Sequence, residues 1–493
     1  MNSAIFLIFA ALAAALFLGL RASRGKDMNL EQWAVAGRGF GTLIVFVLMA
    51  GEIYTTFTFL GGAGYAYGKG APAFYILAYG NLAFVLSYWM LPPIWRYAKQ
   101  KNLLSQPDFF AAKYNSPALG IMVALVGIVA LIPYLVLQLK GLGIIVNTAS
   151  YSAITATQGV WIGAVVVALY VIVSGVHGSA WTAVIKDVLV LAVVVFLGLY
   201  LPLHYYGGIS EMFVQIEQAR PNFLALPDTG LSPTWLVSTV ALSALGFYMW
   251  PHSFAASLTA KHEDILRKNA FILPIYQLIL LFVFLTGFAA VLQVPGLRGG
   301  DIDLALFKIS VKTFDPWFIG VIGAAGVFTA LVPGSMILMT ASTLLANNIY
   351  RSVRPHSDDA HIAMVAKACT PCVMLIAVYF TLGGSETIVA LLLMGYAFVT
   401  QLFPVLLASL LPNNPVNRVA AFASIIVGEA AVGWMSLTKR TIADVLPFLP
   451  AALKDLNVGI VALFLNVATL VMVTILTRRT ARAAKPVVIG ELR

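Results

Sequence analysis

Long apolar runs, repeated along almost the whole sequence, restrict most strongly how this chain can fold. Each run has close to the roughly 20 residues that a helix needs to cross the hydrocarbon core of a bilayer. The runs lie at approximately residues 3–20, 41–66, 73–95, 117–146, 157–175, 180–202, 234–256, 270–293, 316–346, 362–382, 387–411, 417–437 and 457–477. Because backbone groups in hydrocarbon must be hydrogen-bonded within the protein, such runs form helices. The sequence therefore predicts an all-α integral membrane protein with about thirteen transmembrane helices, in a single transmembrane domain over residues 1–493.

The composition agrees with a protein whose surface faces lipid. Hydrophobic residues make up 60% of the chain and charged residues 10%, whereas a soluble domain carries about 25% charged residues. The net charge of +10 does not indicate a nucleic-acid partner, because the basic residues lie in short loops between the runs. The first run is expected to be a retained helix and not a signal peptide. No basic residue precedes it, and Arg21 and Arg24 follow it.

The basic residues in the loops indicate an orientation in the membrane. If the N-terminus lies outside and the runs alternate, about 21 lysine and arginine residues fall on the inner side and about eight on the outer side. Lysine and arginine are enriched in cytoplasmic loops. We therefore expect an N-terminus outside the membrane and a cytoplasmic tail over residues 478–493.

Three charged residues in or near apolar runs are candidates for function, because a charge at the bilayer centre costs at least about 2.5–3.5 kcal/mol. Glu52 lies in the second run and is interpreted as an ion- or proton-binding carboxylate, with a protonated or packing carboxyl as the alternative. Lys140 lies in the fourth run. It requires an anion, which is a substrate carboxylate or Glu52, unless it snorkels to the outer surface. Asp187 follows Lys186 near the inner end of its run and is interpreted as a partner in a structural salt bridge.

Glycine and proline interrupt two of the runs. The second run carries a glycine-rich stretch at 61–64, and the ninth carries Pro333-Gly334. Transporters break helices at such points and present the freed backbone groups to ions and solutes. A kink with close helix packing is the alternative. The hydroxyl groups just before the glycine-rich stretch are candidates for hydrogen bonds to a solute, and they belong to Thr55, Thr56 and Thr58.

The sequence carries no motif of an enzyme or of an ATP-driven pump. It has no Walker loop, no metalloprotease helix and no nucleophile elbow. Cys369 and Cys372 have a redox spacing, but they lie in an apolar run and lack the strand context of a redox site. We therefore expect no catalytic residue and no cofactor. The tail after Leu476 has only about 17 residues, too few for the signalling domain of a sensory module. A channel remains an alternative.

Four stretches, in this order and spacing, resemble the sodium:solute symporter family over nearly the whole chain. They are the region from Ala50 to Gly64, Gln106-Pro-Asp-Phe-Phe, the stretch at 178–189, and Trp250-Pro-His. In the third stretch, Lys186 stands where the family signature has a threonine. The resemblance implies a LeuT-like fold with two inverted five-helix repeats at about 41–202 and 234–411. It also implies peripheral helices at 3–20 and about 417–477.

The resemblance also implies where solute and ion bind, which is at the midplane beside the broken second and seventh runs. A sodium ion would be held by the carbonyl groups of Ala50, Ile53 and Ala330. The two hydroxyl groups that the family places after the last of these fall on Pro333 and Gly334, so that Ser335 or Thr329 is the candidate substitute. The coupling ion would be Na⁺ through these oxygens, or H⁺ through the carboxyl group of Glu52.

Within the family, the residues at 57–61 and 330–334 look most similar to those of bacterial monocarboxylate permeases, which take up lactate, pyruvate and alanine. Lys140 would then pair with the substrate carboxylate. The substrate-binding candidates are Thr55, Thr56, Thr58, Gln138, Lys140, Phe247 and Tyr248. We therefore expect a symporter of small monocarboxylates in a bacterial inner membrane, with another small acid or amino acid, such as pantothenate or proline, as the alternative substrate. The oligomeric state is not indicated.

Overall fold

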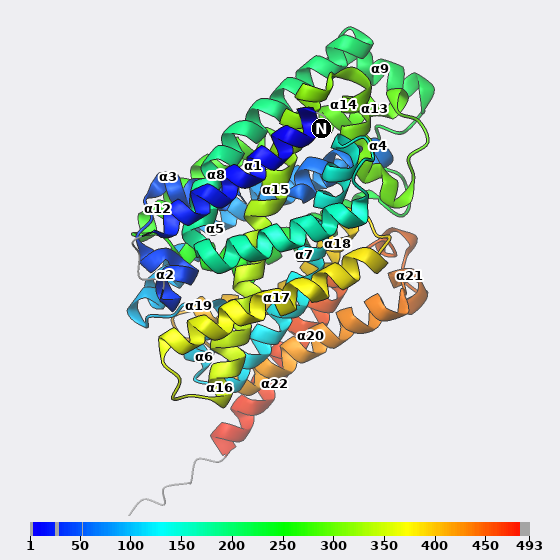
Figure 1. The fold of residues 1–493 in the computed structure, drawn as a ribbon. Helices are drawn as coiled ribbons and strands as arrows, with labels where there is room; N and C mark the ends of the chain where they lie inside the picture. Colours follow the sequence, from blue (N-terminus) through cyan, green and yellow to red (C-terminus); the bar gives the residue numbers. More distant parts are fainter. Residues whose placement is uncertain (1–2, 25–28, 52, 484–493) are drawn as a thin grey trace, which may run out of the picture.

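The computed structural model describes residues 3–24, 29–51 and 53–483, and it is a bundle of helices (Figure 1). The long helices of the bundle are α1 (Ser3–Ser23), α5 (Tyr75–Gln100), α7 (Pro117–Ala149), α8 (Ala156–Tyr206), α12 (Glu263–Gln277), α13 (Leu280–Gln293), α15 (Pro316–Thr343), α17 (Asp359–Gly383), α18 (Ile388–Val399), α20 (Arg418–Thr438) and α22 (Val458–Ala483). The all-α prediction is confirmed for the described residues.

Shorter helices connect and flank the bundle. They are α2 (Leu30–Val35), η1 (Ala36–Arg38), η3 (Ala71–Phe74), α6 (Gln106–Tyr114), α9 (Ile209–Ala219), η5 (Gly299–Leu304), α14 (Ala305–Thr313), η6 (Leu344–Tyr350), α16 (Arg351–Val353), η7 (Thr400–Leu402), α19 (Phe403–Leu410), α21 (Ile442–Val445) and η8 (Ala451–Leu453). At α6, Ser105 and Asp108 form a capping box, in which each side chain accepts a hydrogen bond from the other residue's backbone N–H. Asp108 also accepts a hydrogen bond from Asn348 at 2.6 Å, which ties this capping box to η6.

Ten helices in the described residues are long and apolar enough to cross a membrane. The predicted number of thirteen is therefore not confirmed, and the difference arises at three places. The second and seventh predicted runs contain breaks, so neither is a single long helix. The runs predicted at 157–175 and 180–202 both lie in α8, which is counted once. How many times the chain crosses the membrane stays a prediction.

The helix α8 is sharply bent at Gly175. It has 51 residues, which at about 1.5 Å per residue is roughly 76 Å and far longer than a bilayer. Gly175 has φ 52° and ψ −152°, a conformation that only glycine adopts readily. The hydroxyl groups of Tyr170 and Thr182 lie 2.7 Å apart, although a straight helix would separate these residues by about 18 Å. The chain therefore turns back at the position where the sequence has a gap between two predicted runs.

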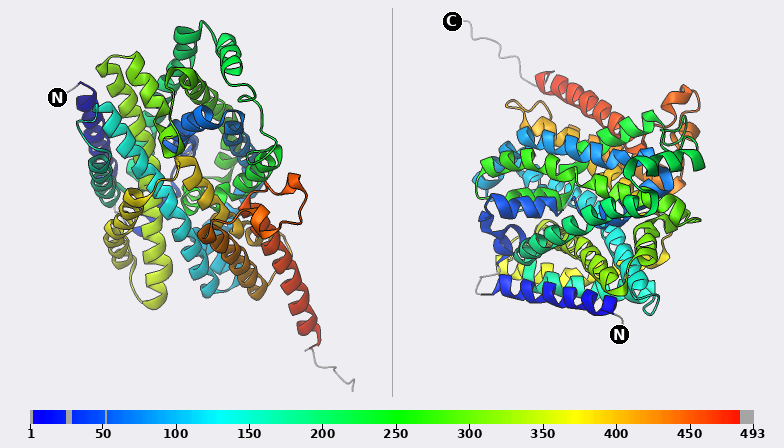
Figure 2. Two further views of the ribbon diagram at one scale, coloured as in Figure 1. Left: turned by 90° about the vertical axis from the view of Figure 1, so that its right-hand side faces the viewer. Right: turned by 90° about the horizontal axis from the view of Figure 1, so that it is seen from above.

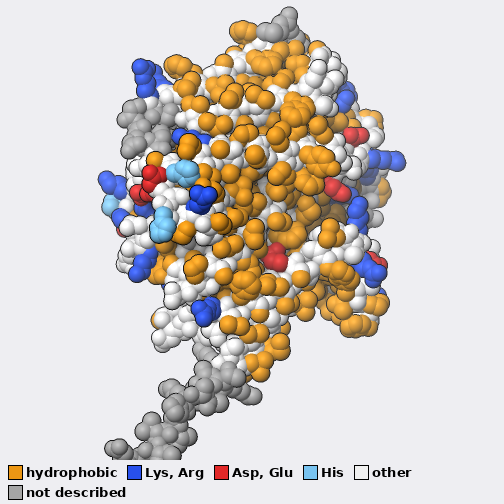
Figure 3. All heavy atoms as spheres, turned by 60° about the horizontal axis from the view of Figure 1, so that its bottom comes forward, with side chains coloured by type: hydrophobic (Ala, Val, Ile, Leu, Met, Phe, Trp, Pro, Cys, Tyr) orange, Lys and Arg blue, Asp and Glu red, His pale blue; other side chains and the backbone are white. Residues whose placement is uncertain are grey.

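The middle of the bundle is formed by α15, whose residues from Ile322 to Thr343 are all buried. In the two views of Figure 2, α1 and α22 lie at opposite edges of the bundle. Large hydrophobic side chains such as Trp89, Val188 and Tyr379 are exposed on the outer helices, and the surface is predominantly hydrophobic with most charges toward two edges (Figure 3). A surface of this kind is suited to lipid. The arrangement of residues 41–202 and 234–411 as inverted repeats stays a prediction.

Candidate functional site

Two helices of the bundle are interrupted in the middle. The first is α3 (Thr42–Ala50), after which the described residues of 51–55 are not helical, and the chain resumes as η2 (Phe57–Gly62) and α4 (Ala63–Lys69). The second is α10 (Pro233–Gly246), which passes through η4 (Phe247–Met249) to an extended residue, Trp250, before α11 (Pro251–Leu258). Such breaks free backbone groups for binding.

The sequence analysis predicted breaks at 61–64 and at Pro333-Gly334, and both predictions are wrong. Residues 61–64 lie within continuous helix, and α15 continues through Pro333-Gly334. The glycines serve close packing instead: a Cβ atom on Gly64 would lie 2.6 Å from the carbonyl oxygen of Ile302. The alternative interpretation, in which small residues let helices approach closely, therefore holds at 61–64.

The three predicted threonines have different roles at the first break. The hydroxyl of Thr58 donates to the carbonyl of Ile53 at 2.6 Å, and the hydroxyl of Thr55 accepts from the backbone N–H of Phe57 at 3.1 Å. These two side chains satisfy the broken backbone. Thr56 is fully buried, and its hydroxyl has no hydrogen-bond partner among the described residues. Only Thr56 of the three is thus available to a solute in this conformation.

Gln138 lies in the middle of α7, next to the first break. Its side chain is 1% exposed, and neither its amide nitrogen nor its amide oxygen has a hydrogen-bond partner in the described part of the chain. One turn further along α7, a Cβ atom on Gly141 would overlap Cγ2 of Thr56, so this face of α7 lies directly against the break. On the other side, a Cβ atom added to Gly334 of α15 would lie 3.7 Å from Cβ of Gln138. An unpaired buried amide costs about 1–3 kcal/mol, which a bound polar solute would offset.

Aromatic side chains surround the second break. Phe247 and Tyr248 contact each other edge to face at 5.0 Å between ring centroids. Trp250 packs between Tyr134 of α7, at 4.9 Å, and Tyr396 of α18, at 5.4 Å. The sequence analysis did not select Trp250, although the Trp-Pro pair that ends the break is visible in the sequence.

Lys140 is bound by a partner that the sequence did not indicate. Its ammonium group lies 2.8 Å from Oδ2 of Asp303 in η5 and donates to the carbonyl of Glu386 at 2.6 Å. Asp303 is fully buried, and its Oδ2 also accepts from the backbone N–H of Ile388 at 3.0 Å. Burial raises the pKa of the Asp303 carboxyl above its ordinary value, although Lys140 and the N–H of Ile388 oppose this. The pair joins α7 to η5 and to the start of α18.

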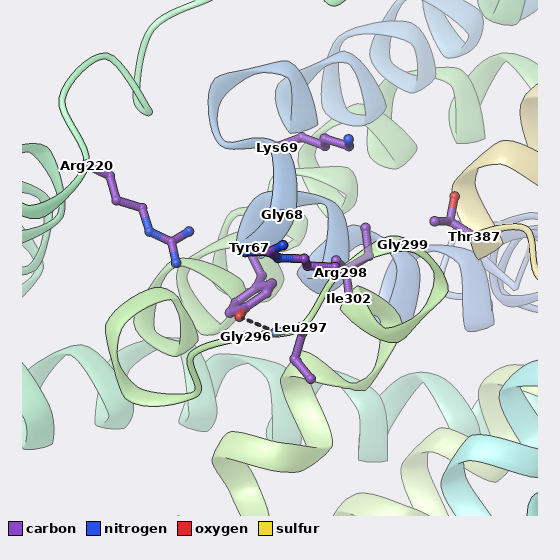
Figure 4. A pocket seen from close by; sticks show the side chains of 10 residues that line it. All are labelled: Tyr67, Gly68, Lys69, Arg220, Gly296, Leu297, Arg298, Gly299, Ile302 and Thr387. Atoms are coloured by element: carbon purple, nitrogen blue, oxygen red, sulfur yellow. Dashed lines mark hydrogen bonds between the residues drawn. The ribbon is translucent and has the colours of Figure 1, made fainter.

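A cavity of about 450 Å³ is lined by residues that adjoin Asp303 and Ile388 in the sequence. Figure 4 shows the residues that line it. Three basic side chains from separate segments line it, and they are those of Lys69, Arg220 and Arg298. Ile302 and Thr387, which also line it, directly precede Asp303 and Ile388 in the sequence. The hydroxyl of Tyr67 donates to the carbonyl of Val294 at 2.6 Å and fixes the loop that carries Arg298. A cavity with three cations concentrates anions from solution.

Two of the oxygens predicted to bind sodium, those of Ala50 and Ser335, form hydrogen bonds within the protein. The carbonyl of Ala50 accepts from the N–H groups of Ile53 at 2.9 Å and of Tyr54 at 3.2 Å. Ser335 donates to the carbonyl of Val332 at 2.7 Å and lies 2.7 Å from the hydroxyl of Ser179. Ala330 is buried within α15. Glu52, the predicted carboxylate for ion coupling, lies outside the described residues.

A charged residue that the sequence analysis did not select lies at the first break. Lys186 of α8 has a fully buried side chain, and its ammonium group lies 3.3 Å from the carbonyl oxygen of Tyr54. It also lies 2.9 Å from Oδ1 of Asp187, which confirms the predicted salt bridge. The only sequence signal for this position was the replacement of a threonine by lysine in the stretch that resembles the family.

The family model of the sodium:solute symporters matches residues 33–428. An uncharacterized symporter of Bacillus subtilis, YhjB, is 61% identical over 98% of this chain and 99% of its own length. A monocarboxylate transport permease protein of Rhizobium johnstonii is 29% identical over 83% of this chain and 84% of its own length. The structure of a Na⁺-coupled sialic acid symporter in a substrate-bound, outward-open state superposes with a TM-score of 0.77 at 16% identity. It covers 96% of this chain and 98% of that one.

These similarities agree with an apolar helical bundle that has two broken helices and unpaired polar groups between them. They confirm the family that the sequence motifs indicated. The chain belongs to the sodium:solute symporter family and is a multi-pass membrane transporter.

Proposed function

We propose that this protein is a secondary active symporter that takes up small monocarboxylates, such as lactate, pyruvate or alanine, together with Na⁺ or H⁺. The observation that carries the proposal is the pair of unsatisfied polar side chains at the first break, Thr56 and Gln138. A hydroxyl group and an amide can each donate and accept, as binding a carboxylate with a neighbouring hydroxy, keto or amino group requires. The similarity to a monocarboxylate permease supports the same substrate class.

The basic cavity favours an anionic substrate. Under the positive-inside orientation the loop at 296–298 lies outside the membrane, so the cavity with Lys69, Arg220 and Arg298 faces the medium from which an acid is taken up. Two residues of the cavity wall, Ile302 and Thr387, adjoin Asp303 and Ile388 in the sequence, so an acid in the cavity would lie near the pair of Lys140 and Asp303. In this proposal the acid passes from the cavity to that pair and then to the first break.

Lys140 would act on the substrate by exchanging its partner. In this conformation its ammonium group pairs with Asp303, and a substrate carboxylate would replace that carboxylate when η5 moves away from α7. The pair would then reform behind the substrate as a gate. Phe247 and Tyr248, at the second break, would cover the solute from the opposite side.

The proposal is tested by uptake of labelled lactate, pyruvate and alanine into proteoliposomes, with Na⁺ and H⁺ gradients imposed separately. Saturable accumulation above the equilibrium level is expected, and unlabelled pantothenate and proline should compete poorly. Liposomes without protein and vesicles with collapsed gradients serve as controls. Strong competition by pantothenate or proline would assign the alternative substrate, and flux that neither saturates nor follows a gradient would indicate a channel.

A further inference from the structure

The ammonium group of Lys186 is a cation that the protein itself places at the break of the second predicted run. The carbonyl oxygen of Tyr54 lies 3.3 Å from it, and a Cβ atom on Gly51 would lie 3.5 Å from it. Both residues belong to the stretch where helix α3 has ended. A freed carbonyl group in a broken helix is the kind of oxygen that transporters offer to a bound alkali cation. Here the ammonium nitrogen of Lys186 lies beside the carbonyl oxygen of Tyr54, where such a cation would bind.

The position of Lys186 is level with the other half of the predicted sodium site. Helices α8 and α15 contact each other through Ser179 and Ser335, whose hydroxyls lie 2.7 Å apart, and through the packing of Ala183 against Val332. Residue numbers fall on α15 as they rise on α8, so the two helices are antiparallel here. One turn beyond Ala183, this register brings Lys186 level with Thr329, the residue next to Ala330.

The charge of Lys186 is balanced within the protein. Asp187 supplies a carboxylate at 2.9 Å, and Tyr276 of α12 lies beside that carboxylate. A fully buried ammonium group is tolerated only with such compensation. The fold therefore stabilises a positive charge at this point. A sodium ion beside it would be strongly repelled, because like charges a few ångströms apart interact strongly in a poorly solvated interior.

We propose that Lys186 takes the place of the coupling sodium ion, so that this symporter binds no Na⁺ at the break and transports its substrate without Na⁺. The part of this proposal that concerns transport rests on the function proposed above. Of the two coupling ions considered, the proton then remains. In this proposal, the side chain of Lys186 is what distinguishes the protein from a sodium-dependent carrier.

The first test measures sodium binding and requires no knowledge of the substrate. The melting temperature of the purified protein is compared in NaCl and in choline chloride of equal ionic strength. The wild type should not respond to Na⁺. The variant Lys186→Thr loses the ammonium group and leaves a hydroxyl, the carbonyl of Tyr54 and the carboxylate of Asp187 as oxygen ligands, so about 100 mM Na⁺ should raise its melting temperature by about 2–4 °C.

Two further variants make this test specific. Lys186→Met also loses the ammonium group but supplies no oxygen ligand, and its melting temperature should respond to Na⁺ less than that of Lys186→Thr. Lys186→Arg keeps the positive charge and should remain insensitive to Na⁺. Stabilisation of the wild type by Na⁺ but not by choline would overturn the proposal. This measurement decides the matter even if a variant fails to fold.

The second test measures transport. In proteoliposomes that accumulate an acid, the initial rate of the wild type should change less than about twofold when choline replaces Na⁺. An imposed H⁺ gradient should drive accumulation without Na⁺. A wild type that transports only with Na⁺ would refute the inference. A wild type that takes up none of the acids would refute the proposed substrate, and the melting experiment would still decide on Lys186.

Discussion

Replacing Lys140 by methionine should reveal how strongly the pair with Asp303 stabilises the contact of α7 with η5. Asp303 is fully buried, its Oδ1 has no hydrogen-bond partner among the described residues, and its Oδ2 would keep only the N–H of Ile388. Removing one partner of a buried ion pair costs about 3–5 kcal/mol, because the other charge stays buried without compensation. Unfolding entropy scales at about 2.1 cal/mol/K per residue, so a chain of this length loses about 3–5 °C in melting temperature.

The dependence on pH distinguishes an uncompensated charge from lost packing. Burial already raises the pKa of Asp303, and Lys140 opposes that rise. In Lys140→Met the opposing charge is gone, so the pKa rises further. A carboxyl group whose pKa is higher in the folded than in the unfolded protein binds its proton more tightly when folded, so folding is favoured as pH falls. The melting temperature of Lys140→Met should therefore lie well below that of the wild type at pH 8, and the difference should shrink toward pH 5.

The assay is the melting temperature of the purified protein in detergent, followed by tryptophan fluorescence at several pH values. The double variant Lys140→Met/Asp303→Asn has no buried charge at this place, and its amide oxygen can still accept from Ile388, so it should recover most of the loss. The same deficit at pH 5 and pH 8, or a double variant no more stable than Lys140→Met, would refute the electrostatic reasoning.

Three further predictions concern the route of the substrate. Gln138→Leu should raise the KM for acids at least about tenfold without lowering the melting temperature, because both amide atoms of Gln138 lack partners and leave no group unpaired when removed. Gly141→Val should abolish uptake and cost about 1–3 kcal/mol of stability, because its side chain would overlap Thr56; Gly433→Val, in a place where a Cβ atom meets nothing within 4 Å, is the control. Arg298→Gln should raise the KM about two- to fivefold at low ionic strength and have little effect in high salt, because the cavity acts through screened charges; equal effects at both would contradict this.

The sequence was sufficient for the features that depend on local composition. The apolar runs located the long helices, and the gap between the runs at 157–175 and 180–202 fell next to Gly175, where α8 turns back. The break in the second run was placed at the wrong residues. Glycine at 61–64 suggested it, but glycine both breaks helices and lets them pack closely, and here Ile302 lies against Gly64. Which of the two effects applies depends on the neighbouring helix, which the sequence of one segment does not contain.

Which charged residues pair with each other also could not be predicted from the sequence. The partner of Lys140 is 163 residues away in η5, and no spacing rule connects a residue in one apolar run to a loop that follows four further runs. For Asp187 the sequence indicated a structural salt bridge without naming the partner, and the contact of Lys186 with Tyr54 is made over 132 residues. The salt bridge therefore looked purely structural until the fold placed it at a broken helix.

The two lysines differ in how their counter-charges are attached, and this difference bears on the roles proposed for them. Asp303 reaches Lys140 from another segment, so any motion that separates η5 from α7 breaks the pair and frees the ammonium group for a substrate. Asp187 is the next residue after Lys186 in the same helix, so no rearrangement of helices can separate their backbones. A pair that conformational change can open is suited to a gate, whereas a pair that moves as one unit keeps its charge in place throughout the cycle. Under the two proposals, the fold thus puts a removable anion on the path of the acid and a permanent cation in the place of the coupling sodium ion.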